Sequence, residues 1–266
     1  MSLLPATASS SDDAATALAV GALAATLAAV AHETLGHGIG CVGIGGQITL
    51  LTSIWFRCSK WSGIVDAGGP LGNLAAGLVA FALLGYKRPR ATVRLFLLMF
   101  GSLNLFVFTG QLALESVTSN RDDWYSTALQ MEWPAAWRAI GAIIGIGGYL
   151  LVRRLATLVV RKQAGPHPHA IRLAYAGAAA SAVIAGLIWQ PEPFRSAAQG
   201  FLAVGIAPLG LLDVARRASR DQRDGTGSNA VPRSWIWISV CAAVYVVFLL
   251  VQARGLGSMA GSRLSP

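Results

Sequence analysis

Residues 14 to 37 have the sequence AATALAVGALAATLAAVAHETLGH, an apolar run that ends with two histidines and a glutamate. Residues 14 to 31 contain no charged side chain and approach the ~20 residues that a helix needs to cross a lipid bilayer. His32, Glu33 and His37 follow directly. Because ionisable side chains are costly inside a membrane span, they usually mark a functional site there. This stretch predicts a membrane helix with polar chemistry near one end.

The rest of the chain is equally apolar. Of its 266 residues, 54% are hydrophobic and only 12% are charged, which excludes a soluble domain with a polar surface. We therefore predict an all-α polytopic protein of the cell membrane or an inner membrane, with six or seven transmembrane helices embedded in the lipid bilayer. The number is open because the fourth and sixth of the seven runs are marginal in length. The six further runs cover residues 68–86, 95–114, 134–152, 173–190, 197–212 and 234–253.

The net charge of +9 comes from basic residues between the apolar runs. A nucleic-acid-binding protein needs a solvated basic face with interleaved aromatic residues, so we predict no nucleic-acid partner. With seven spans, three basic connections share one side of the bilayer, and the positive-inside rule assigns that side to the cytoplasm. The basic residues of these connections are Lys87, Arg88, Arg90 and Arg94; Arg153, Arg154, Arg161, Lys162 and Arg172; and Arg216, Arg217, Arg220 and Arg223.

The segment after the first run differs from the helical spans. Three glycines between residues 43 and 46 break the helix, and residues 47 to 58 are rich in β-branched and aromatic side chains. This predicts a short β element, of one or two strands, at the membrane surface. Cys41, Cys58 and Cys241 are odd in number and scattered, so we predict no disulfide framework.

Three polar motifs fall on the same side of the bilayer. H-E-T-L-G-H closes the first span at residues 32–37, G-G-P-L-G-N opens the second at residues 68–73, and S-N-R-D-D-W follows the third at residues 119–124. We expect Pro70 in the first turn of the second helix. Proline has no backbone N–H, and the N–H groups of a first turn have no acceptor within the helix, so no hydrogen bond is lost there. Because consecutive spans cross the bilayer in opposite directions, the three motifs converge.

These motifs supply the groups of a candidate zinc site. A catalytic zinc binds neutral imidazoles and usually a third oxygen or nitrogen ligand, and keeps an open position for water, whose proton a nearby carboxylate takes. We predict one Zn²⁺ bound by His32, His37 and Asp123, with Asp122 as the alternate third ligand and Glu33 as the general base. The competing explanation of a histidine in a span is a hydrogen-bonded packing residue.

The spacing of the two histidines exceeds that of the zinc-protease signature H-E-x-x-H by one residue. In a regular α-helix, residues five apart point ~140° away from each other, whereas residues four apart differ by only ~40°. A π-bulge, with i→i+5 hydrogen bonds, would realign His32 and His37. Gly36 and Gly38 lower the energetic cost of this distortion, because glycine accepts backbone angles that other residues resist. We therefore predict that residues 33 to 38 depart from a regular α-helix if both histidines bind one ion.

A rival ligand set lies on one helical face without any distortion. Glu33, His37 and Cys41 follow one another at four-residue steps. This set ranks lower because it leaves no obvious general base.

The third apolar run adds polar residues whose role stays open. Asn104 lies in the middle of the run, and Gln111 and Glu115 follow at about one-turn steps. They could line a substrate cleft or form hydrogen bonds between packed helices, and the spacing fits both equally.

Together the motifs resemble the site-2 protease family of intramembrane zinc metalloproteases. The resemblance covers about residues 14 to 130 and implies that the two histidines and an aspartate bind zinc while the glutamate activates water. Asp123 is preferred over Asp122 because Asp-Trp resembles a variant of divergent relatives. The residues that the resemblance assigns to placing the substrate strand are Gly69, Pro70 and Asn73.

The resemblance implies a zinc metalloendopeptidase that hydrolyses peptide bonds of membrane-protein or peptide substrates. It divides the chain into a three-span catalytic core with the metal motif, residues 1–133, and accessory transmembrane helices, residues 134–266. An alternative is a non-catalytic metal-binding or transport protein derived from the same scaffold. A membrane di-iron oxidase is a third possibility, but four histidines are too few for its multiple histidine boxes.

Overall fold

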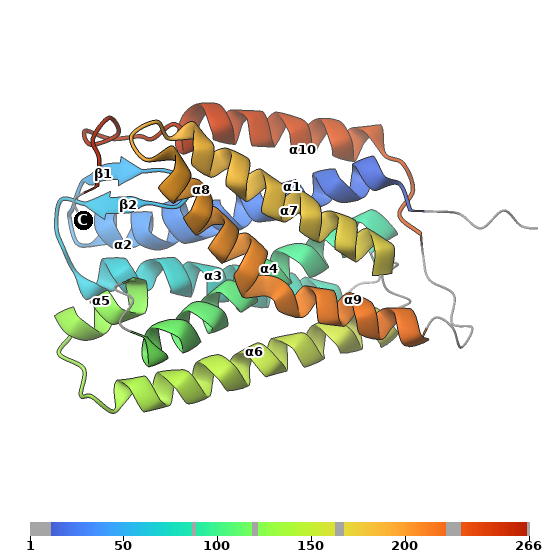
Figure 1. Ribbon diagram of the computed structural model, residues 1–266, viewed down its shortest axis with the longest axis horizontal. Coiled ribbons are helices and arrows are strands. Elements are labelled where there is room, and N and C mark those ends of the chain that lie inside the picture. The colour runs from blue at the N-terminus through green and yellow to red at the C-terminus, as the bar shows by residue number, and fades with distance from the viewer. Residues whose placement is uncertain (1–11, 87–88, 119–121, 163–167, 222–229, 265–266) are drawn as a thin grey trace, which may run out of the picture.

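The computed structural model describes residues 12–86, 89–118, 122–162, 168–221 and 230–264. In this part of the chain, seven helices are long and apolar enough to cross a membrane. The predicted all-α, multi-pass membrane fold is thus confirmed, and the described residues contain seven candidate spans. The helices form one bundle with their axes running mainly along its length (Figure 1). The spans are Ala14–Gly43, Gly63–Tyr86, Ala91–Val117, Trp137–Arg161, Pro168–Ile188, Pro193–Ser219 and Trp235–Ala253.

Three of the spans change helical geometry along their length. The first, sixth and seventh each contain a π-helical segment, labelled η. The elements are α1 Ala14–Ala29, η1 Val30–His37, α2 Gly38–Gly43, β1 Ile48–Leu51, β2 Phe56–Cys58, α3 Gly63–Tyr86, α4 Ala91–Val117, α5 Asp123–Gln130, α6 Trp137–Lys162, α7 Pro168–Ile188, α8 Pro193–Phe201, η2 Leu202–Ile206, η3 Ala207–Leu209 (a 3-10 turn), α9 Gly210–Asp221, α10 Trp235–Phe248 and η5 Leu249–Ala253.

Helix α1 packs against helices from both halves of the chain. It contacts α4 of the first half and α7 and α10 of the second, while α4 also packs against α6. Small side chains allow the close approach, since Ala17, Ala24, Ala174 and Ala178 are fully buried in this core. The helices of residues 134–266 therefore pack directly on the three spans that contain the metal motif.

Helix α3 begins earlier than expected. It starts at Gly63, so Pro70 is its eighth residue and lies inside the helix, where the prediction placed it in the first turn. A proline there cannot donate a hydrogen bond to the carbonyl four residues before it. The helix is held at this point by its contact with η1, because Gly68 and Gly36 meet backbone to backbone.

The predicted β element is a two-stranded antiparallel sheet. Leu51 in β1 lies opposite Phe56 in β2. The other edge of β1 is covered by the end of the chain, since Leu51 and Leu256 exchange two backbone hydrogen bonds of 2.9 Å. Gln252, at the end of the last span, bonds to Thr34 in η1 and donates to the Thr52 carbonyl. The last span is thus tied to the loop that follows the first.

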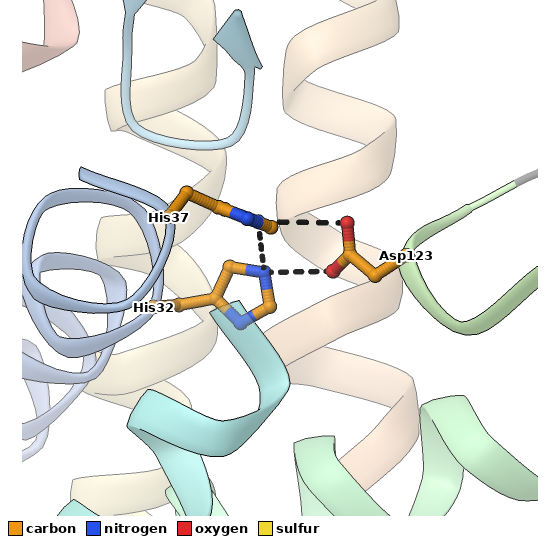
Figure 2. Close-up of side chains that lie close together, drawn as sticks. All are labelled: His32, His37 and Asp123. Atoms are coloured by element: carbon orange, nitrogen blue, oxygen red, sulfur yellow. Dashed lines mark hydrogen bonds and ion pairs between the residues drawn. The ribbon is translucent and has the colours of Figure 1, made fainter. Parts of the chain in front are cut away.

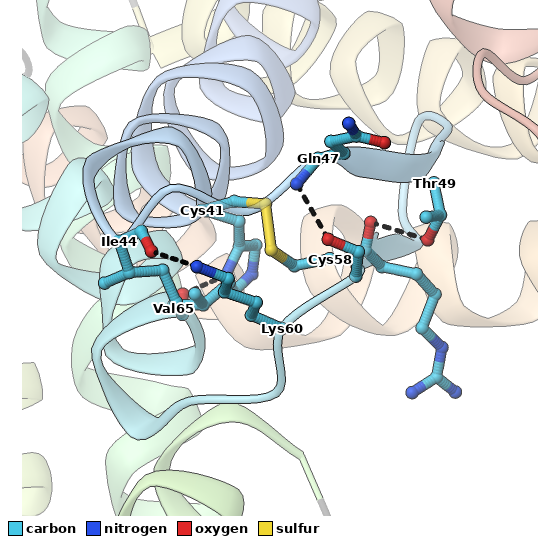
Figure 3. The surroundings of a disulfide bond; sticks show 10 residues. Cys41, Ile44, Gln47, Thr49, Cys58, Lys60 and Val65 are labelled. Atoms are coloured by element: carbon cyan, nitrogen blue, oxygen red, sulfur yellow. Dashed lines mark hydrogen bonds between the residues drawn. A yellow bond between two sulfur atoms is a disulfide. The ribbon is translucent and has the colours of Figure 1, made fainter.

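Cys41 in α2 and Cys58 in β2 form a disulfide, with their Cα atoms 5.8 Å apart (Figure 3). The sequence predicted no disulfide framework and did not reveal this single bond, because the number and spacing of cysteines do not show how the chain folds back. A turn with a positive φ of 69° at Gly45 ends α2 and brings β2 back beside it. Gly46 leaves room for the bond, since a Cβ atom there would collide with both sulfurs.

The two ends of the bundle differ in chemistry. The β-hairpin, α2 and α5 lie at one end, and the C-terminal parts of α6 and α9 lie at the other (Figure 1). The α6 and α9 end contains Arg153, Arg154, Arg161, Arg216 and Arg217. By the positive-inside rule we expect this basic end in the cytoplasm. The disulfide agrees, because cytosolic reductants keep thiols reduced and disulfides persist in oxidising compartments.

This orientation makes a prediction for the three cysteines. When whole cells are denatured in the presence of a thiol-blocking reagent, we expect mass spectrometry to recover Cys41 and Cys58 as linked peptides and Cys241 as a blocked thiol. In the control Cys58→Ser, Cys41 should become blocked as well. Recovery of Cys41 and Cys58 as free thiols in the wild-type protein would show that the hairpin end faces a reducing compartment.

Candidate metal centre

His32, His37 and Asp123 meet at the hairpin end of the bundle (Figure 2). The Nε2 atoms of the two histidines are 3.2 Å apart, and the Asp123 oxygens lie 3.0 Å from His32 Nε2 and 3.5 Å from His37 Nε2. A tetrahedral zinc with bonds of about 2.0–2.1 Å separates its ligand atoms by about 3.3–3.4 Å. These three groups therefore have the chemistry and the spacing of a zinc ligand set.

The two histidines come together because the motif is not α-helical. Residues Val30–His37 form a π-helix, so the departure from a regular α-helix that was predicted for residues 33 to 38 is present, although it begins three residues earlier and ends at His37. The i→i+5 repeat of a π-helix places residues five apart on one face. The imidazole rings of His32 and His37 accordingly approach edge to face, with centroids 4.8 Å apart.

Gly36 and Gly69 leave the space that this arrangement needs. A Cβ atom at Gly36 would collide with the backbone of Gly68 and Gly69. A Cβ atom at Gly69 would collide with the Nε2 atoms of both His32 and His37. Glycine at position 69 thus keeps open the volume directly beside the ligand nitrogens, as a site for a metal ion requires.

A chain of hydrogen bonds from α4 through α3 fixes the tautomer of His32. Asn104 Nδ2 donates to the Phe100 carbonyl at 2.7 Å, so its Oδ1 faces Asn73 and accepts from Asn73 Nδ2 at 2.7 Å. Asn73 Oδ1 then faces His32 Nδ1 at 2.5 Å, which makes Nδ1 the protonated nitrogen. The Nε2 atom therefore has a free lone pair that can bind a metal. In metal sites, a ligating histidine commonly donates its other ring N–H to an acceptor in this way.

His37 is oriented in the same way by a backbone group. Its Nδ1 lies 2.7 Å from the Val65 carbonyl, which can only accept, so the proton is on Nδ1. Phe56 of β2 stacks on the imidazole with ring centroids 5.3 Å apart. The disulfide of Cys58, two residues along β2, therefore helps to hold the aromatic ring that supports His37.

Asp123 is the first residue of the short helix α5 and is positioned by two side chains of α4. Gln111 Nε2 donates to Asp123 Oδ2 at 2.8 Å, and Glu115 Oε2 accepts from the Tyr125 backbone N–H at 2.8 Å. Burial raises the pKa of the Asp123 carboxyl, but positive charge on His37 and His32 and the hydrogen bond from Gln111 lower it below its usual range. A metal ion held by the same nitrogens would supply that positive charge, so Asp123 would bind it as a carboxylate.

Glu33 is buried beside the ligand group. Its side chain is only 3% exposed, and among the described residues its Oε2 has no hydrogen-bond partner. Buried polar atoms without partners are rare in folded proteins, and each one calls for an explanation. A carboxylate oxygen of this kind, next in sequence to His32, has free capacity to accept a proton or a hydrogen bond.

The structure places the other predicted residues as follows. Asp122 precedes α5 with an exposed side chain and is not part of the ligand group. Cys41 is bonded to Cys58, so the rival set of Glu33, His37 and Cys41 lacks a thiolate. Asn73 contacts His32 and Asn104, and its role in substrate placement, which the resemblance implies, stays a prediction.

The sequence indicated that the polar residues of α4 share one helical face, but it did not show what they contact. Asn104, Gln111 and Glu115 are seven and four residues apart, so they share one face of a helix. The structure shows that this face meets the metal centre: Asn104 acts through Asn73, Gln111 contacts Asp123, and Glu115 holds the backbone of α5.

The role of Asn73 can be tested by zinc affinity. We expect Asn73→Leu to weaken zinc binding roughly 10- to 100-fold, because mutation of groups that orient ligands commonly has this effect. Asn73→Asp should have an affinity between those of wild type and Asn73→Leu, since a carboxylate still accepts the His32 Nδ1 proton but cannot donate to Asn104 Oδ1. Competition with a chromogenic chelator measures both. Thr109→Val is the matched control, because the buried Thr109 hydroxyl bonds only to the backbone of α4. Equal affinities of Asn73→Leu and wild type would refute the orienting role.

Comparison with models of known protein families, with curated proteins and with solved structures gives no match.

Proposed function

We propose that the chain is a membrane-embedded zinc peptidase that hydrolyses peptide bonds of membrane-associated proteins or peptides. The observation that supports this proposal best is the convergence of His32, His37 and Asp123 at ligand spacing beside the buried carboxylate of Glu33. The resemblance of the motifs to the site-2 protease family points the same way. Two imidazoles, one carboxylate and a nearby glutamate are the groups that metal-assisted hydrolysis requires.

A zinc ion bound by these residues would supply a Lewis acid that polarises the peptide carbonyl and lowers the pKa of a water molecule. Glu33 takes a proton from the attacking water, whose oxygen bonds to the carbonyl carbon. The same residue passes the proton to the leaving amine as the C–N bond breaks, which yields a carboxylic acid and an amine that then exchange a proton to give a carboxylate and an ammonium group. His32 and His37 keep their Nδ1 protons throughout, because Asn73 and the Val65 carbonyl hold them.

The position of the site restricts the substrate. The ligand group lies at the end of the first span, beside the opening turns of α3 and the short helix α5. A peptide bond reaching it must be extended, because backbone groups that are paired within a helix are not readily attacked. A helical membrane segment therefore has to unwind before cleavage, so segments with helix-breaking residues near the membrane surface are the preferred substrates.

The alternative is a protein that binds or transports metal without hydrolysis. Such a protein needs the three ligands but no general base, and the buried Glu33 Oε2, which has no hydrogen-bond partner among the described residues, would be an unexplained cost in it. The two functions separate in one experiment on purified protein: zinc content and peptide cleavage are measured on the same preparations of wild type, Glu33→Gln and His37→Ala. Hydrolysis that depends on both residues supports the peptidase, and bound zinc without hydrolysis supports the alternative.

A further inference from the structure

The disulfide between Cys41 and Cys58 joins the two elements that hold His37. Cys41 lies in α2, four residues after His37, on the helix that continues from η1. Cys58 lies in β2, two residues after Phe56, whose ring stacks on the His37 imidazole. The bond therefore links the strand that covers His37 to the helix from which His37 extends (Figure 3).

The two strands of the hairpin are attached to the rest of the protein unequally. The outer edge of β1 is bonded to the end of the chain at Leu256 and Met259. β2 is attached at its start by Trp55, whose indole N–H donates to a serine of α8 at 2.8 Å. At its end, β2 is held by the disulfide of Cys58 and by hydrogen bonds of the exposed residues 59–60. Because water can replace the bonds of exposed residues, the disulfide is the main attachment at this end.

Cys58 is the more accessible of the two cysteines. Cys41 is fully buried, whereas Cys58 is partly exposed and lies two residues before the exposed Lys60. The Lys60 ammonium group donates to the Ile44 carbonyl at 3.0 Å, two residues before Gly46, which packs against both sulfurs. A cation near a disulfide stabilises the thiolate that leaves when the bond is attacked, and exposed disulfides are more readily reduced than buried ones.

We propose that the Cys41–Cys58 disulfide is a reducible site through which a dithiol, such as that of a thiol–disulfide oxidoreductase, weakens metal binding. The proposal rests on the zinc site of the proposed function. A thiolate of the dithiol attacks the Cys58 sulfur, the S–S bond breaks, and Cys41 leaves as a thiolate that takes up a proton. The second thiol of the reagent loses its proton and attacks the mixed disulfide, which releases Cys58 as a thiol. Both cysteines are then reduced, and the dithiol is oxidised to a disulfide.

The effect of reduction reaches the metal centre through Phe56. When the end of β2 is released, the Phe56 ring is free to leave the His37 imidazole. His37 keeps its 2.7 Å contact with the Val65 carbonyl but loses the ring that restricts its rotation. Loss of groups that orient a metal ligand commonly lowers metal affinity by roughly 10- to 100-fold, so we expect reduction to lower zinc affinity about tenfold.

The test is competition for zinc with a chromogenic chelator, on purified full-length protein before and after reduction by a thiol-free phosphine. Wild type should lose about tenfold in affinity on reduction and regain it on reoxidation. Cys41→Ser/Cys58→Ser should bind as reduced wild type and ignore the phosphine, which excludes an effect of the reagent on the assay. Cys241→Ser keeps the disulfide and should respond as wild type. Equal affinities of oxidised and reduced wild type overturn the proposal.

Two further measurements identify the route of the effect. In metal-free protein, hydrogen exchange of β2 should become faster on reduction while that of β1 stays unchanged, and an unchanged β2 overturns the proposed release. Phe56→Ala should bind zinc more weakly than wild type and should not respond to reduction, because the ring is already absent. A response as large as that of wild type would refute the route through Phe56. If oxidised wild type has no zinc affinity, the proposed function itself is refuted, which distinguishes the two failures.

Discussion

Replacement of Glu33 by glutamine is expected to abolish peptide hydrolysis while one zinc ion per chain remains bound. Glutamine has nearly the shape of glutamate but cannot accept the proton of the attacking water at neutral pH. General acid–base catalysis typically contributes a factor of ~10²–10⁴ to the rate, so the residual activity should be lower by at least that range. Because Glu33 is not in the ligand group, the metal should stay.

The measurement does not require a known substrate. Membranes that contain wild-type protein or Glu33→Gln are compared by mass spectrometry of protein N-termini, and cleavage sites found only with wild type define the substrates. Purified protein in lipid nanodiscs is then tested on peptides spanning those sites. Thr109→Val, which removes a buried hydroxyl that bonds to the backbone of α4, is the matched control and should still cleave. Cleavage by Glu33→Gln at the wild-type rate would eliminate the proposed mechanism.

Loss of a ligand is expected to remove the metal itself. Purified wild-type protein should contain about one zinc ion per chain, and His37→Ala and Asp123→Ala should contain almost none, because two remaining ligands do not hold the ion. Elemental analysis by plasma mass spectrometry measures this directly. Asp122→Ala should keep its zinc, since the Asp122 side chain is exposed and outside the ligand group.

The pair of aspartates makes this experiment specific. Both variants remove one negative charge from adjacent positions, so a general electrostatic effect would lower the zinc content of both equally. A ligand role lowers only that of Asp123→Ala. If Asp122→Ala loses zinc and Asp123→Ala keeps it, the ligand assignment is wrong, and if wild-type protein contains no zinc, the metal site itself is refuted.

Much of the architecture follows from the distribution of apolar residues. Seven apolar runs predicted six or seven spans, and the described part of the chain has seven candidate spans, including the two marginal ones. The five-residue spacing of His32 and His37 required a distortion, and the π-helix at Val30–His37 provides it. These features could be inferred because they depend on hydrophobicity and helical periodicity, which are local properties of the chain.

Other features depend on contacts between segments that are distant in the sequence, and hydrophobic periodicity gives no information about such contacts. The disulfide between Cys41 and Cys58 forms because the hairpin returns beside α2. Asn73 contacts His32 because α3 begins at Gly63 and packs closely on η1. Likewise Gln111 and Glu115 were compatible with two roles, and only the position of α5 shows which groups they hold.

The hydrogen bonds of Gln252 determine when, during synthesis, the candidate metal site gains its contacts with the last span. Thr34 and Thr52 are bonded to Gln252, which follows them by 218 and 200 residues. At a synthesis rate of about 5–20 residues per second, this separation corresponds to roughly 10–40 s on the ribosome. The helix with the metal motif therefore enters the membrane long before its partners exist, and the emerging chain spends that interval without the contacts that brace its site.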